Sequence, residues 1–107
     1  MVIQTVGGVV LDKIDELINR RENQLLLHAC LYYRWNANII SDDTYDKWSF
    51  ELADLIDKYP KHFKNSYYYK QFKGFVPDSG YYLPYNIKKD RAYHIYQAYK
   101  KEKRLKS

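Results

Sequence analysis

The chain has 107 residues, of which 46% are hydrophobic and 18% aromatic, with thirteen tyrosines and a formal net charge of +5. This length predicts a single domain, residues 1–107, with a hydrophobic core of modest size. No apolar segment approaches the roughly 18 residues that span a bilayer, and the N-terminal residues lack the features of a signal peptide, so we expect a cytoplasmic protein that does not enter a membrane.

The first predicted element is a long helix over residues 10–35. Residues of its apolar face recur about every 3.6 positions, at Leu11, Ile14, Leu17, Ile18, Leu25, His28 or Ala29, and Tyr32. Polar residues such as Asp15, Arg20 and Glu22 fall mostly off this face, and neither Gly nor Pro interrupts the pattern. Cys30, within the same helix, is expected to be a small buried hydrophobic residue in a reducing compartment.

A second helix is predicted from residue 41 or 42 to about residue 59. The breaker sequence Asn36-Ala37-Asn38 precedes it, and either Ser41 or Asp42 would cap its N-terminus. Pro60 is expected to follow its end. Two helices joined by a short connector form an αα-hairpin, here over residues 11–62.

The remaining chain divides into an aromatic segment and a basic one. Residues 63–87 combine tyrosines and phenylalanines with Gly and Pro, which predicts a compact tyrosine-rich loop layer with a helical turn near 66–72. Residues 90–103 predict a last helix that buries Ala92, Ile95, Tyr96 and Tyr99. Residues 88–107 contain eight basic and two acidic residues, whereas 1–87 contain ten basic and eleven acidic ones. The predicted fold is therefore all-α, with a basic C-terminal helix.

Two short motifs meet at the connector between the first two helices. Leu31-Tyr32-Tyr33 lies near the end of the first helix, and Ile40-Ser41-Asp42-Asp43-Thr44-Tyr45-Asp46 opens the second. The aspartates at 42 and 46 are four apart and share one helix face. Aromatic faces bind flat cationic rings, and carboxylates accept hydrogen bonds from a ribose diol or a carboxamide. We therefore expect both motifs to line one pocket.

These motifs resemble the N-terminal Ia domain of the bacterial NAD-dependent DNA ligases. In that family a Tyr-Tyr or Tyr-His pair and an Ile-Ser-Asp-x-x-Tyr-Asp element bind the nicotinamide mononucleotide half of NAD. The resemblance covers residues 11–62 and implies that Tyr32 stacks on the nicotinamide ring. It assigns the rest of the site to Tyr33, Asp42, Tyr45 and Asp46. This chain departs from the family at 36–38, where the family has Asp-x-Pro, and at Trp48, where it has leucine.

The sequence has no Lys-x-Asp-Gly nucleotidyltransferase motif, and its three histidines lack metal-ligand spacing. We therefore expect no ligase catalysis, no catalytic residues and no metal site. The resemblance implies a stand-alone module that binds NAD or nicotinamide mononucleotide. Such a module would serve a separate nucleotidyltransferase, or would sense or sequester the nucleotide.

An alternative assigns the function to residues 63–107. Small basic tyrosine-rich chains are typical of phages and mobile elements, where they bind and inhibit host proteins. The helical hairpin would then be a scaffold, and the target a ligase, a defence nuclease or an NAD-consuming enzyme. The basic residues near the C-terminus would contact that partner or nucleic-acid phosphates, or would simply be solvated at a helix end; they are Lys100, Lys101, Lys103, Arg104 and Lys106.

Overall fold

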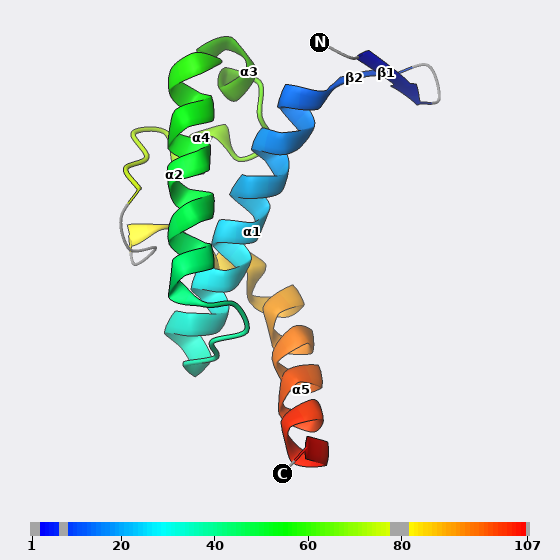
Figure 1. Cartoon of the computed structure of the whole chain (residues 1–107), viewed down its shortest axis with the longest axis vertical. Coiled ribbons are helices and arrows are strands. Elements are labelled where there is room, and N and C mark those ends of the chain that lie inside the picture. The colour runs from blue at the N-terminus through cyan, green and yellow to red at the C-terminus, as the bar shows by residue number, and fades with distance from the viewer. Residues whose placement is uncertain (1–2, 7–8, 78–81, 107) are drawn as a thin grey trace.

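The computed structural model describes residues 3–6, 9–77 and 82–106, with side chains described for 13–77 and 82–105. Its elements in chain order are β1 (Ile3–Val6), β2 (Val9–Asp12), α1 (Lys13–Trp35), α2 (Asp42–Lys58), α3 (Pro60–Lys64), α4 (Tyr69–Phe72), the 3-10 helix η2 (Tyr85–Lys88) and α5 (Lys89–Lys106) (Figure 1). Apart from the two short strands the described fold is all-α, which confirms the predicted class. None of its helices is long and apolar enough to cross a bilayer.

The start of the first helix was predicted too early. Residues 9–12 form strand β2, which pairs antiparallel with β1 so that Val6 lies opposite Val9 and Thr5 opposite Val10. β-branched residues favour strands, and here the pairing outweighs the helical spacing of the apolar residues. The helix therefore begins at Lys13.

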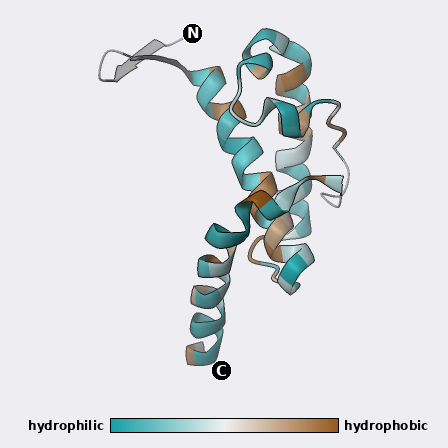
Figure 2. Ribbon diagram, turned by 180° about the vertical axis from the view of Figure 1, so that it is seen from behind, coloured by the Kyte–Doolittle hydropathy of each residue, from teal (hydrophilic) through white to brown (hydrophobic). Residues whose placement is uncertain are grey.

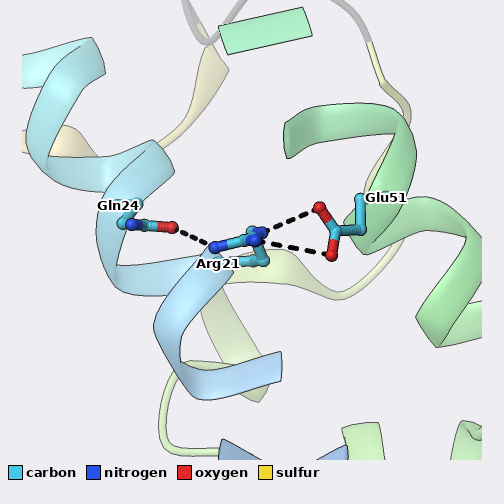
Figure 3. Close-up of polar contacts among 3 residues, drawn as sticks. All are labelled: Arg21, Gln24 and Glu51. Carbon is cyan, nitrogen blue, oxygen red and sulfur yellow. Dashed lines mark hydrogen bonds and ion pairs between the residues drawn. The ribbon is translucent and has the colours of Figure 1, made fainter. Parts of the chain in front are cut away.

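Helices α1 and α2 lie side by side and run in roughly opposite directions (Figure 1). The guanidinium group of Arg21 on α1 contacts both carboxylate oxygens of Glu51 on α2, at 3.0 and 3.4 Å, and also donates to the side chain of Gln24 (Figure 3). This ion pair joins the two helices at mid-length, beside a buried core.

The buried side chains form two clusters that share α1. The first lies where α1 meets α2, α3 and α4, and consists of Ile18, Leu25, Leu26, Leu52, Leu55, Phe63, Phe72 and Leu83. The second lies where the end of α1 meets α5, and consists of Cys30, Leu31, Ala37 and Ala92. The predicted burial of Cys30 is confirmed. Ile95, Tyr96 and Tyr99 pack against the second cluster, as predicted for the last helix.

Between α2 and α5 the chain is more helical than predicted. Pro60 does not simply follow a helix end but begins α3, because its fixed backbone angle and missing N–H suit the first position of a helix. The predicted turn near 66–72 is present as α4. Residues 85–88 form η2, although 85–87 were predicted to belong to the loop layer. The part of that layer at 78–81 lies outside the described residues.

Glu22 is buried, although it was placed among the polar residues off the apolar face of α1. Its two carboxylate oxygens accept hydrogen bonds from the hydroxyl of Ser66 and the backbone N–H of Tyr68. These partners come from the segment before α4, which covers this side of α1. A buried carboxylate requires such partners.

Helix α5 contacts the rest of the molecule through its first half and then extends away from it (Figure 1). It is longer than the predicted 90–103 and is mostly hydrophilic along its length (Figure 2). Its described side chains from residue 101 onward are exposed.

Candidate functional site

The connector between α1 and α2 is fixed at both ends by local interactions. Asn36 has a positive φ of 53°, and its N–H and that of Ala37 donate to the carbonyl oxygens of Tyr32 and Leu31. A residue in the left-handed conformation is a common helix terminator. At the other end the Ser41 hydroxyl accepts a hydrogen bond from the N–H of Thr44 at 3.1 Å, which caps α2. Ser41 is thus the N-cap residue.

A cavity of about 480 Å³ lies between this connector and the two helices. All five residues predicted for the binding site line it: Tyr32, Tyr33, Asp42, Tyr45 and Asp46. The backbone brings them together because the end of α1 and the first turn of α2 are adjacent in space. The volume lies in the range of small-molecule binding pockets.

The two neighbouring tyrosines have different surroundings. Tyr33 stacks on Tyr85 of η2, with ring centroids 5.4 Å apart and an angle of 20° between the ring planes. Tyr32 meets the ring of Tyr33 edge-on and keeps 42% of its surface exposed. Tyr33 is therefore held between other aromatics, whereas Tyr32 has surface left to contact a ligand.

Tyr45 reaches from α2 across to α1. Its ring packs against the larger core cluster, and its hydroxyl lies 3.5 Å from the backbone carbonyl oxygen of Leu25. Burial raises the pKa of the Tyr45 hydroxyl, with smaller contributions from Tyr33, Tyr82 and Asp46. The side chain therefore stays neutral at physiological pH and acts as a fixed wall of the cavity.

The charged residues of the cavity are acidic. Asp42 and Asp46 lie on successive turns of α2, and both are exposed to solvent. The described lining contains no lysine or arginine. A cationic group is therefore favoured in this cavity and a phosphate is disfavoured.

The lining also includes residues that were not predicted for the site, among them His28 and Phe50. His28 lies one turn before Tyr32, and its ring centroid is 5.7 Å from that of Trp48. Burial lowers the pKa of His28, so its imidazole is neutral at pH 7 and can both donate and accept a hydrogen bond. Phe50 lies one turn after Asp46. Helical spacing from the predicted residues would have identified both positions.

The basic C-terminal residues lie on α5 and do not line this cavity. The ammonium groups of Lys100 and Lys103 lie over the rings of Tyr96 and Tyr99, 4.9 and 5.1 Å from the ring centroids. Lys101 and Arg104 are exposed, and the side chain of Lys106 lies outside the described residues. Within the described part of the chain no cluster of His, Cys, Asp or Glu could hold a metal ion.

Comparisons of the chain with protein-family models, with curated proteins and with solved structures gave no match.

Proposed function

We propose that the cavity between α1 and α2 binds the nicotinamide mononucleotide part of NAD, or nicotinamide mononucleotide itself. The observation that carries this proposal is the meeting of Tyr32, Tyr33, Asp42, Tyr45 and Asp46 around one cavity of about 480 Å³. Their sequence motifs resemble those with which the ligase Ia domain binds the same ligand. The resemblance is one of sequence motifs. The cavity adds that residues of both motifs line a single space.

Each part of the ligand has a chemical counterpart in the cavity. The oxidised nicotinamide ring is flat and cationic, and it would stack on the exposed ring of Tyr32. The ribose hydroxyls and the carboxamide N–H groups would donate hydrogen bonds to Asp42 and Asp46. His28 offers one further donor or acceptor at the wall of the cavity.

The acidic lining indicates how the nucleotide should be oriented and which oxidation state of its ring should bind more tightly. Because the described lining has two aspartates and no basic residue, the phosphate of the nucleotide would point out of the cavity towards solvent or a partner protein. The reduced nicotinamide ring is uncharged and would lose the attraction to tyrosine and aspartate. We therefore expect the oxidised nucleotide to bind more tightly than the reduced one.

The sequence has no Lys-x-Asp-Gly motif, so we assign no adenylation chemistry to the chain itself. In a complex with a nucleotidyltransferase, the module would contribute by holding the leaving nicotinamide mononucleotide in position. Without such a partner, binding alone would sense or sequester the nucleotide.

Calorimetric titration with oxidised and with reduced nicotinamide mononucleotide tests the proposal. We expect saturable binding of the oxidised form, weakened about fivefold or more by Tyr32→Ala and by Asp46→Asn. Tyr67→Ala is the matched control, because Tyr67 is 80% exposed and does not line the cavity. No heat with millimolar oxidised nucleotide, or equal loss in the control, would refute the proposal.

A second candidate function is binding of a host protein through residues 63–87. The observation that favours it is the exposure of large apolar side chains there: Tyr67 is 80% exposed, Val76 59% and Tyr82 52%. Exposed tyrosines are common in protein interfaces. In this case Tyr67→Ala would impair the biological activity of the protein, and Tyr32→Ala would leave it intact.

A further inference from the structure

Helix α5 concentrates the charge of the molecule. It contains seven basic and two acidic residues, a net charge of +5 that equals the net charge of the whole chain. Its second half extends away from the helical body (Figure 1). An extended basic helix next to a neutral body favours a polyanionic partner.

Aromatic and basic residues share one side of this helix. Lys89, Tyr93, Tyr96, Lys100 and Arg104 follow one another at spacings of three and four positions, so they share one face, named here the aromatic–basic face. Tyr93 is 47% exposed, and the ammonium group of Lys100 lies over the ring of Tyr96. The face therefore offers both ring surfaces and positive charges.

The end of α1 enlarges this face. Trp35 stacks on Tyr96, with ring centroids 5.1 Å apart and an angle of 10° between the ring planes. The centroid of the Trp35 ring also lies 6.0 Å from that of the Tyr93 ring. The guanidinium group of Arg34 lies 5.3 Å from the centroid of the Trp35 ring. A groove of about 500 Å³ lies here, lined by Arg34, Trp35, Lys89, Asp90, Tyr93 and His94.

We propose that the aromatic–basic face and the adjoining groove bind single-stranded nucleic acid. Unpaired bases stack on exposed aromatic rings, and basic side chains along the same surface bind the phosphates. Tyr93 provides the stacking surface. Lys89 lies about one turn before it, and Lys100 lies about two turns after it. Asp90, the acidic residue of the groove, can accept hydrogen bonds from base amino groups.

A single strand fits these features better than other polyanions. In a duplex the bases are stacked on each other and cannot reach an exposed tyrosine, so a duplex would use only the basic residues. An acidic protein could pack against the tyrosine and tryptophan rings, but it has no unpaired bases to stack on them alongside its charges. This inference does not depend on the proposed nucleotide site, which lies elsewhere on α1 and α2.

Fluorescence anisotropy with labelled single strands of about 20 nucleotides tests the proposal, using DNA and RNA of the same sequence. Tyr93→Ala should weaken binding about fivefold or more, because the base loses its stacking partner. The control Tyr67→Ala, which alters another exposed tyrosine, should bind like the unaltered chain. Binding of DNA or RNA that is weakened by Tyr93→Ala but not by Tyr67→Ala supports the proposal. The nucleic acid that binds with the higher affinity identifies the preferred sugar.

A second pair of variants tests the charges. Lys89→Gln combined with Lys100→Gln should reduce the slope of log affinity against log salt by about 1.4, since about 0.7 is lost for each phosphate contact with a single strand. Lys61→Gln combined with Lys64→Gln removes the same charge from α3 and should leave the slope unchanged. Circular dichroism of all variants checks the fold.

Three results would overturn the proposal. The first is absence of saturable binding at low salt. The second is equal affinity for a duplex or for polyglutamate, together with no effect of Tyr93→Ala. The third is an equal change of salt slope in the two double variants, which would place the contacts outside the aromatic–basic face.

Discussion

The hydroxyl group of Ser66 donates a hydrogen bond to the Oε2 atom of Glu22, 2.8 Å away. The backbone N–H of Tyr68 donates to the other carboxylate oxygen at 3.3 Å. Burial raises the pKa of Glu22 to about 7, and the two hydrogen bonds offset part of that effect. A single buried carboxyl group thus holds the segment before α4 against α1 and titrates near neutral pH.

Stability should therefore depend on pH through Glu22. Because the pKa is raised in the folded state, the folded chain binds a proton more tightly than the unfolded chain, and stability falls as pH rises from about 4.5 to about 7. The expected fall is on the order of 2–3 kcal/mol. Urea unfolding at several pH values measures it. Glu22→Gln should flatten this part of the profile, and an unchanged profile in that variant would contradict the assignment.

The ion pair between Arg21 and Glu51 should contribute measurably to stability. It has two contacts, at 3.0 and 3.4 Å, and the Arg21 side chain is only 16% exposed. We expect Glu51→Ala to cost about 1 kcal/mol in thermal or urea unfolding. Asp54→Ala is the control, because its pair with Lys58 is about 60% exposed and should contribute little. Equal losses of unfolding free energy in the two variants would mean that the pair of Arg21 and Glu51 contributes no more than an exposed pair.

The left-handed backbone at Asn36 should make this position sensitive to substitution. Its φ is 53°, a conformation that glycine adopts without strain and that costs other residues about 1–2 kcal/mol. Asn36→Gly should therefore leave stability nearly unchanged, and Asn36→Val should lower it by at least about 1 kcal/mol. Differential scanning calorimetry of the two variants compares them directly. Equal melting temperatures would show that the end of α1 is not fixed by this residue.

The two tyrosines at the end of α1 should have separable effects. Tyr33→Ala removes the stack on Tyr85 and should destabilise the chain by about 1 kcal/mol or more. Tyr32→Ala removes an exposed ring and should leave the melting temperature nearly unchanged while weakening nucleotide binding. Measurement of both properties in both variants tests this division. A large loss of stability in Tyr32→Ala would assign that residue a packing role.

Much of the helical fold could be predicted because the necessary signals are local. Helix α2 follows from the breaker sequence at 36–38 and a capping residue at 41 or 42, and the five candidate site residues follow from motifs at the two ends of one connector. Their meeting in a cavity was predicted because consecutive helix ends joined by a few residues must lie close together. The identity of the ligand remains a proposal.

The errors concern pairing and packing contacts that the helical spacing of apolar residues does not reveal. Helical spacing alone placed residues 10–12 in α1, although the pairing of Val6 with Val9 makes them a strand. Two β-branched segments separated by Gly-Gly are a signal for a β-hairpin that could have corrected this. Glu22 was placed off the apolar face of α1, although it lies four positions after Ile18 and three before Leu25 and is buried like them. Only the packing of residues 66–68 explains how a carboxylate is tolerated there.

The concentration of positive charge on α5 also gives the molecule a large electric dipole moment. The helix carries a charge of +5, and the rest of the chain is close to neutral. In the field of a polyanion the molecule would turn during its approach so that α5 leads, before any contact forms. Encounter would therefore be faster than random collision allows, and it would slow to the random rate as added salt shortens the range of the field.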